Sequence, residues 1–241
     1  MKDVERYFVA IGTLATPIEA EAKALAADLG STAYEERLVL AAGLPAIVLA
    51  TTDEAAAHAL RGKLVARGHR AQVCRATDVI SADAMVPMRR FQLDAEALDS
   101  GDGAARLPWT DVACFVRAKH VRVTQTTATV KEKKLALGRA VLTGGLLTRK
   151  TETREVVKRS EDTEQVLYVF PGDGTTPWLL RELATHYGGL GAALAPTATA
   201  NFNAALELFR KRAPHARFDD SLLRRPPVED VDLYAHLIAH G

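Results

Sequence analysis

Covalent catalysis needs a nucleophile that an adjacent base activates, and few side chains in this sequence could take that role. They are Ser31, Ser81, Ser100, Ser160 and Ser221, together with Cys74 and Cys114. None of the serines lies in the glycine-flanked turn that presents a catalytic serine. Both cysteines lie in apolar, strand-like runs, where a buried and reduced thiol is expected. The sequence therefore gives no indication of a nucleophilic enzyme.

Metal and phosphate sites are not indicated either. Among the seven histidines, only His236 and His240 have the i, i+4 spacing that places two ligands on one helix face. They lie in the C-terminal tail, where solvated side chains are expected. The glycines at 138, 144 and 145 lack the following Lys-Ser or Lys-Thr of a phosphate-binding loop, and no GxGxxG motif is present. We expect no metal and no cofactor.

Basic residues are concentrated in the middle of the chain. The whole sequence has a net charge of +1, but residues 117–160 contain twelve basic and three acidic residues. This segment of 44 residues therefore carries +9, and the rest of the chain carries −8. The cations could form the solvent-exposed face of alternating strands, where they protect strand edges. Alternatively, they present a positive surface to an acidic partner.

The most unusual part of this basic segment is residues 135–150, where leucines and valines surround three glycines and basic side chains lie at the margins. The candidate binding residues are Lys131, Lys133, Lys134, Arg139, Arg149, Lys150 and Arg154. An apolar tip with a basic rim suits an acidic protein groove or an anionic membrane, unless the leucines fold back onto the core. Nucleic acid is less favoured, because no aromatic residue lies between Phe115 and Tyr168 to stack on a base.

Residues 1–96 predict an N-terminal α/β domain. Strands are expected at 7–12, 46–51 and 71–75, and helices at 18–29, at 33–41 and from Asp53 to Gly68. In the last helix, Ala56, Leu60, Leu64 and Val65 are expected to face inward. The order strand, two helices, strand, helix, strand resembles the C-terminal domain of the ribosomal stalk protein and the proteolytic adaptor ClpS. A ferredoxin-like arrangement fits almost as well, and this resemblance implies no function.

The remaining sequence predicts a linker, a second domain and a tail. The glycine-rich run at 99–103 indicates a linker over 97–105. Residues 106–218 combine short β-rich runs with a helix that begins at Asn201 and has Phe202, Ala205, Leu206 and Phe209 on one stripe. This pattern, opening at Leu107–Val112 with a later hairpin at 167–182, resembles a bacterial pleckstrin-homology-like domain. Residues 219–241 form a tail with a possible terminal helix.

The overall composition of the chain limits the class of protein. Of the 241 residues, 48% are hydrophobic, which is enough for a packed core. No apolar run approaches the ~20 residues of a membrane span, and the N-terminus lacks the pattern of an export signal. Two cysteines cannot form the disulfide framework of a secreted domain. A cytoplasmic protein is therefore expected.

We expect an α+β fold of two small domains, an N-terminal α/β sandwich and a C-terminal antiparallel β module with a closing helix. The leading functional hypothesis is a non-enzymatic, bacterial-type adaptor or scaffold that binds a protein or peptide, with the basic loop as contact surface. One alternative is peripheral binding to anionic lipid. The other is an enzyme whose site is assembled from scattered residues such as His120, Arg122 and Glu182. The sequence leaves the partner and the oligomeric state open.

Overall fold

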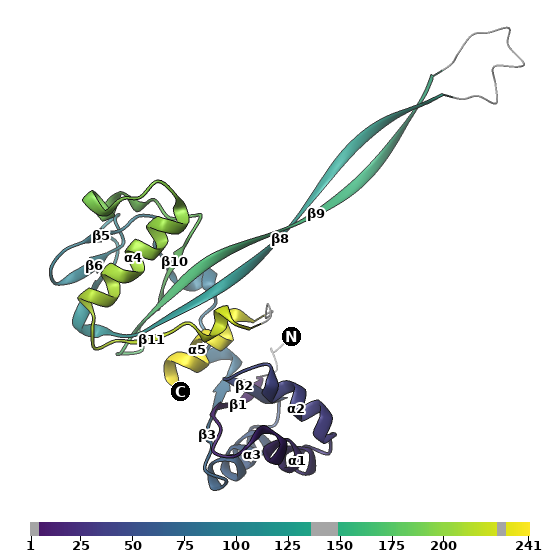
Figure 1. Cartoon of the computed structure of the whole chain (residues 1–241), viewed down its shortest axis with the longest axis vertical. Helices are drawn as coiled ribbons and strands as arrows, with labels where there is room; N and C mark the ends of the chain where they lie inside the picture. The colour runs from purple at the N-terminus through teal and green to yellow at the C-terminus, as the bar shows by residue number, and fades with distance from the viewer. Residues whose placement is uncertain (1–4, 136–148, 226–229) are drawn as a thin grey trace, which may run out of the picture. The chain divides into compact units, whose positions relative to one another are not determined.

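The first part of the chain forms a three-stranded antiparallel sheet with three helices on one face (Figure 1). The computed structural model describes the backbone of residues 5–135, 149–225 and 230–241, and the side chains of these ranges except 121–162. The elements are β1 (Tyr7–Thr13), α1 (Ile18–Leu29), α2 (Ala33–Ala41), β2 (Ala46–Thr51), α3 (Glu54–Ala66) and β3 (Arg70–Arg75). The strand order is β2-β1-β3. The predicted order of elements is confirmed.

Local signals set the ends of these helices. Thr32 and Glu35 form a capping box at the start of α2, and the Asp53 carboxylate accepts from the Ala56 N–H at the start of α3. Gly30 ends α1 in the left-handed conformation, with a φ of 72°. Two inward assignments were wrong: Ala56 is exposed and Val65 is 46% exposed, while Leu60 and Leu64 are buried. Helical spacing fixes a stripe only to within one residue, so a neighbour of a buried position is easily misassigned.

Strand β1 buries both of its faces. Tyr7, Val9 and Ile11 pack against the three helices. Ala10, which points to the opposite side, packs against two leucines of the C-terminal helix, Leu233 and Leu237. The continuous apolar run at 7–11 is therefore that of a strand covered on both sides.

A small antiparallel sheet follows, with the order β5-β6-β7. Its strands are β5 (Gln92–Leu93), β6 (Ala97–Asp99) and β7 (Arg106–Pro108). Residues 97–105, for which the sequence predicts a linker, contain β6 and the turn to β7, which is closed by the Ser100 N–H bond to the Ala105 carbonyl (3.0 Å). The domain boundary expected there stays a prediction.

The largest sheet has five strands in the order β11-β8-β9-β10-β4. They are β4 (Val86–Pro87), β8 (Val112–Leu135), β9 (Arg149–Pro171), β10 (Trp178–Arg181) and β11 (Arg217–Asp219). β9 and β10 are antiparallel, but β11 runs parallel to β8 and β4 parallel to β10. The expected antiparallel module is thus corrected to a mixed sheet, because both edge strands come from segments distant in the sequence. The short runs predicted within 112–131 and 151–170 also merge into two long strands.

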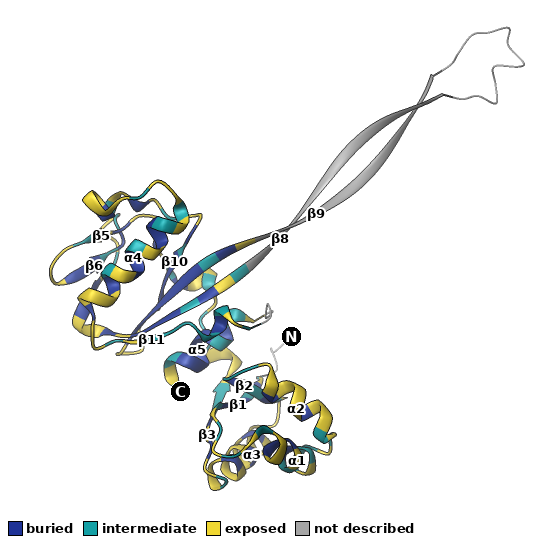
Figure 2. Cartoon of the chain, in the orientation of Figure 1, coloured by how far each residue is buried: buried dark blue, intermediate teal, exposed yellow. Residues whose placement is uncertain are grey.

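Helix α4 (Ala198–Arg212) covers one face of this sheet, as Figure 2 shows by its buried stripe. Phe202, Ala205, Leu206 and Phe209 are buried there, which confirms the predicted stripe. They pack with Phe115 and Leu167 of the two long strands. The helix begins three residues before the predicted start, because the Thr197 hydroxyl caps it by accepting from the Ala200 N–H (3.1 Å).

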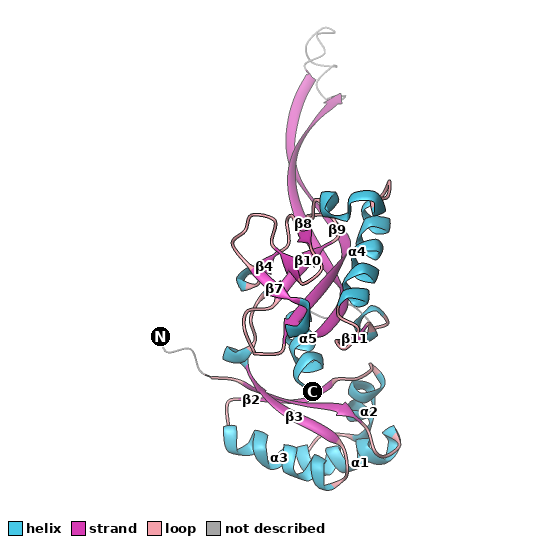
Figure 3. Ribbon diagram, turned by 90° about the vertical axis from the view of Figure 1, so that its left-hand side faces the viewer, coloured by secondary structure: helices cyan, strands magenta, loops and turns pink. Residues whose placement is uncertain are grey.

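Helix α5 (Val231–His240) covers the other face of the five-stranded sheet, seen from a second direction in Figure 3. Ala235 and Ile238 pack with Val116, Tyr168 and other side chains of that face. The preceding Arg225 donates to the carbonyls of Ala42 (3.1 Å), Gly43 (2.6 Å) and Pro45 (2.8 Å), and its guanidinium lies 4.4 Å from the Tyr234 ring centre. Arg225 therefore anchors this part of the chain to the loop between α2 and β2.

The chain divides into two compact units. One combines the residues up to His120 with those from Glu164 onward, and the other is Val121–Thr163. The first unit contains all the helices of the described chain and most of the strands. The fold is α+β, as the sequence predicts.

Leu237→Ala should lower the free energy of unfolding by about 2–5 kcal/mol, because this buried side chain fills the contact between α5 and β1. Urea denaturation measures the change. Leu194→Ala, at a position that is 56% exposed, is the control and should stay within about 0.5 kcal/mol of the wild type. Equal effects of the two substitutions would show that α5 is not packed as described.

Candidate functional site

Six of the seven predicted binding residues lie on the two longest strands. Lys131, Lys133 and Lys134 belong to β8, and Arg149, Lys150 and Arg154 belong to β9. Arg139 and the centre of the predicted apolar tip lie outside the described residues.

Over part of their length these two strands have no other strand beside them in the described chain. β11 pairs with β8 only at Cys114–Val116, and β10 pairs with β9 only at Val166–Val169. In the described chain, residues 121–135 and 149–163 therefore have only each other as strand neighbours (Figure 1). We call these two ranges the β8–β9 ribbon. It contains nine basic and five acidic residues, a net charge of +4.

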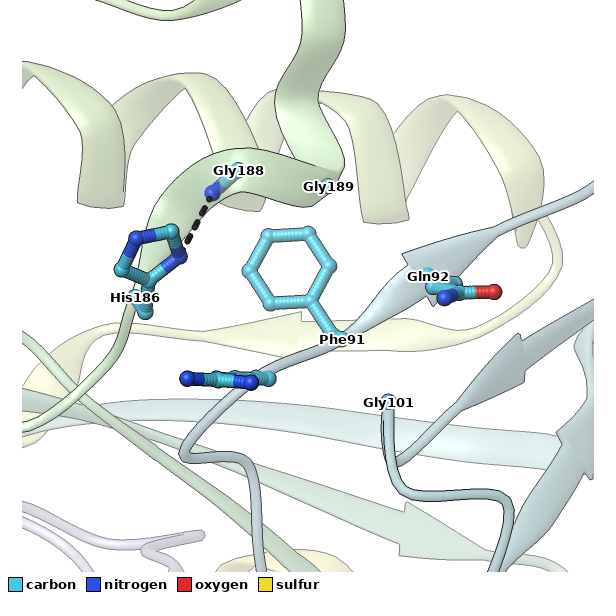
Figure 4. Close-up of a pocket in the computed structure, with 7 residues that line it drawn as sticks. Phe91, Gln92, Gly101, His186, Gly188 and Gly189 are labelled. Atoms are coloured by element: carbon cyan, nitrogen blue, oxygen red, sulfur yellow. Dashed lines mark hydrogen bonds between the residues drawn. The ribbon is translucent and has the colours of Figure 1, made fainter.

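A separate open depression of about 400 Å³ lies between β5 and the 3₁₀ segment η4 (Tyr187–Ala193) (Figure 4). Its lining consists of Arg90, Phe91, Gln92, Gly101, His186, Gly188 and Gly189. Two of these chain segments are joined by a parallel bridge between Arg90 and His186. The His186 N–H donates to the Arg89 carbonyl (2.8 Å), which fixes the segments side by side.

Glycines allow this close approach. A Cβ at Gly189 would lie 2.1 Å from the Phe91 carbonyl oxygen, and a Cβ at Gly101 would lie 2.8 Å from the Arg90 carbonyl carbon. Gly101 also has a φ of 77°, which other residues rarely adopt. Three glycines thus form part of the wall, and the charged or ionisable side chains of the lining are Arg90 and His186.

The His186 ring has a defined hydrogen-bond pattern. The Gly188 N–H donates to Nδ1 (3.4 Å), so Nε2 carries the hydrogen of the neutral imidazole (Figure 4). No ion pair among the described residues includes His186 or Arg90. Both side chains are exposed donors.

A polar cluster joins α5 to the five-stranded sheet. The Tyr168 hydroxyl donates to Asp232 Oδ1 (2.7 Å) and, because it has one hydrogen, accepts from His120 Nε2 (2.6 Å). The Ala82 N–H donates to Asp232 Oδ2 (2.8 Å). Burial raises the pKa of Tyr168 above its ordinary value and lowers the pKa of His120. The cluster is suited to holding α5 in place with a neutral phenol and a neutral imidazole.

The hydrogen bonds of His120 and Glu182, two residues of the scattered-residue enzyme hypothesis, do not join them in one site. The partners of His120 are Tyr168 and Asp232. Glu182 instead accepts from the Gln165 N–H (3.0 Å) and the Thr199 hydroxyl. The side chain of Arg122 lies outside the described part. Sequence reasoning missed Tyr168 and Asp232, since only the fold brings these distant residues to His120.

His236 is buried, which corrects the solvated tail expected for it. Its Nδ1–H donates to the Asp232 carbonyl (2.9 Å), and its Nε2 accepts from the Ile80 N–H (3.2 Å). The ring lies edge-on to Phe170, with the ring centres 5.1 Å apart. A second proton on this imidazole would face the Ile80 N–H, so the fold favours the neutral form.

Within the described ranges, no three His, Cys, Asp or Glu side chains gather as a possible metal site. In the same ranges, no helix combines the length and apolar character needed to cross a membrane.

A scan against protein-family models and searches of curated proteins and of solved structures found no match for the chain. The resemblances to the ribosomal stalk domain, to ClpS and to pleckstrin-homology-like domains therefore stay predictions.

The free energy of unfolding should decrease as the pH falls below about 6.5, the ordinary pKa of histidine. Burial, and then the nearby His240, lower the pKa of His236 in the folded state, while its bond to the Asp232 carbonyl partly opposes this. The unfolded chain therefore takes up the proton first, and the stabilisation present above pH 6.5 is lost as the pH falls through the folded pKa. His120 acts in the same direction.

Urea titrations at several pH values measure this dependence. His236→Gln should flatten it, whereas His215→Gln, at an exposed position, should leave it unchanged. If His236→Gln kept the full slope of the wild type, the buried neutral imidazole would not be its source.

Gly189→Ala should destabilise the protein by about 1–3 kcal/mol, because its Cβ overlaps the Phe91 carbonyl oxygen. Gly62→Ala is the matched control. Gly62 lies within α3 with no atom within 4 Å of an added Cβ, so alanine should stabilise the protein by about 0.5–1 kcal/mol. Thermal unfolding should show opposite shifts, and a neutral Gly189→Ala would argue against the close approach of η4 to β5.

Proposed function

We propose that this chain is a non-enzymatic adaptor that binds an acidic protein or peptide along the β8–β9 ribbon. The observation that carries the proposal is the pairing pattern, in which strand segments 121–135 and 149–163 have no third strand among the described residues.

A two-stranded ribbon with no further strand beside it would be stabilised by a bound partner. Two strands alone are marginally stable in water, and three or more strands or a packed face are usually required. Each outer edge also has backbone donors and acceptors that no described strand satisfies, and such edges are templates for a further strand. Addition of an extended peptide to a sheet edge is a common mode of protein recognition. The ribbon supplies two such edges.

Charge indicates the character of the partner. The ribbon carries a net +4, and the wider segment 117–160 carries +9 in a chain of net +1. Complementary charge increases association rates and disfavours basic partners. Repulsion between two positive ribbons also opposes edge-to-edge pairing with a second copy. An acidic strand or surface therefore fits best.

Affinity capture with the full-length chain tests the proposal. Lys131→Glu, Lys150→Glu and Arg154→Glu together should reduce capture of acidic proteins from a cell extract by about tenfold or more, equivalent to about 1.4 kcal/mol. The matched control reverses three exposed cations elsewhere, Lys23, Arg37 and Lys211, and should retain the wild-type set. Quantitative mass spectrometry compares the three baits.

Equal capture by all three baits would contradict a role for the ribbon. Cosedimentation with phosphatidylserine vesicles, but not with neutral vesicles, at about 0.15 M salt would indicate that the partner is an anionic membrane and not a protein. Both charge-reversal variants change the net charge of the chain equally. A difference between them therefore reports binding at the ribbon and not nonspecific electrostatic binding.

A further inference from the structure

We propose that the depression between β5 and η4 is an oxyanion site, in which Arg90 and His186 bind the phosphate or carboxylate group of a small molecule. The site lies in the first compact unit, away from the ribbon in sequence, and the proposal does not rest on the adaptor function.

The fold brings the backbones of these two residues together before any ligand arrives. Residues paired across a bridge direct their side chains to the same side of the backbone, a few ångströms apart. The bridge joins Arg90 to His186, and it is secured by the His186 N–H bond to the Arg89 carbonyl and by the Thr185 hydroxyl bond to the Met88 carbonyl (2.9 Å). Because the bridge fixes the two backbones, binding does not have to bring the two chain segments together.

The local charge favours an anion. Arg90 presents up to five N–H donors in a planar fork that matches the oxygens of a phosphate or carboxylate, and His186 adds its Nε2–H. No acidic residue lines the depression. Arg90 has no ion-pair partner among the described residues, so a bound oxyanion would supply the missing counter-charge.

Nearby acids are already engaged elsewhere. Asp94 and Asp99 of the adjoining β5–β7 region both pair with Arg106, at 2.8 and 2.9 Å. Asp102, next to Gly101, accepts from the Ser100 hydroxyl and from the Ala104 N–H (3.0 Å). None of these bonds involves Arg90 or His186. The two donors thus remain available for an external oxyanion.

The size of the depression indicates the class of ligand. About 400 Å³ exceeds the volume of a single phosphate ion, so the oxyanion belongs to a larger small molecule. Three of the seven lining residues are glycines, and Gln92 supplies the remaining polar side chain (Figure 4). The buried ring of Phe91 offers little apolar surface, so a polar phosphorylated or carboxylated metabolite fits better than a hydrophobic acid.

NMR titration of the full ¹⁵N-labelled chain with inorganic phosphate, and separately with sulfate, tests the site. Saturable shifts should concentrate on the amides of 89–92 and 186–189. Arg90→Gln and His186→Gln should each weaken binding by about tenfold. Arg89→Gln is the matched control, because Arg89 is exposed, adjacent and absent from the lining, and it should change the affinity less than twofold.

The spectra themselves show that each variant is folded. Shifts that do not saturate, or that Arg89→Gln reduces as much as Arg90→Gln, would overturn the proposal. An unchanged sulfate affinity in His186→Gln would remove His186 from the site.

Discussion

Helix α5 is the element on which the rest of the first compact unit depends, because two sheets share it as their cover. Leu233 and Leu237 pack on the outer face of β1, while Ala235 and Ile238 pack on the five-stranded sheet. Five of its ten residues are buried, because apolar side chains on both sides of the helix contact a sheet. Its removal would expose apolar surface on both sheets at once.

The C-terminal carbonyls of α5 are bound from both sides. Gln72 of β3 donates to the Leu237 carbonyl (2.7 Å), and Arg70 of the same strand donates to the Gly241 carbonyl (2.5 Å). Arg217 of β11 donates to the carbonyls of Ile238 and Ala239 from the other sheet. Helix ends leave their last carbonyls unpaired and carry partial negative charge, so these donors satisfy and stabilise the terminus. The polar cluster of Tyr168 and Asp232 fixes the opposite end.

Local chemistry made the N-terminal elements predictable. Pro17, Thr32 and Asp53 precede helices, and Gly30 follows one, so each boundary is encoded within a few residues. Parallel edge strands of two or three residues have no comparable signal, and β4 and β11 were missed for that reason. The docking of α5, and with it the burial of His236, depends on surfaces contributed by residues from about 60 to more than 200 positions away in the sequence.

The two candidate sites also differ in how far the sequence predicts them. Charge composition alone identified the basic segment, and the structure adds that its strands lack further neighbours in the described chain. Arg90 and His186 carry no motif, since their proximity arises from one bridge between distant segments. Glycines at 101 and 189 are ordinary turn signals in the sequence, and only the packing shows that they permit a close backbone approach.

Native-state hydrogen exchange at increasing denaturant most directly tests whether α5 couples the two sheets. Amides of Val9 and Ile11 in β1 and of Leu167 and Val169 in β9 should exchange through one shared opening, with the same free energy and the same denaturant dependence. Independent openings, in which the β1 amides exchange while those of β9 stay protected, would contradict this account.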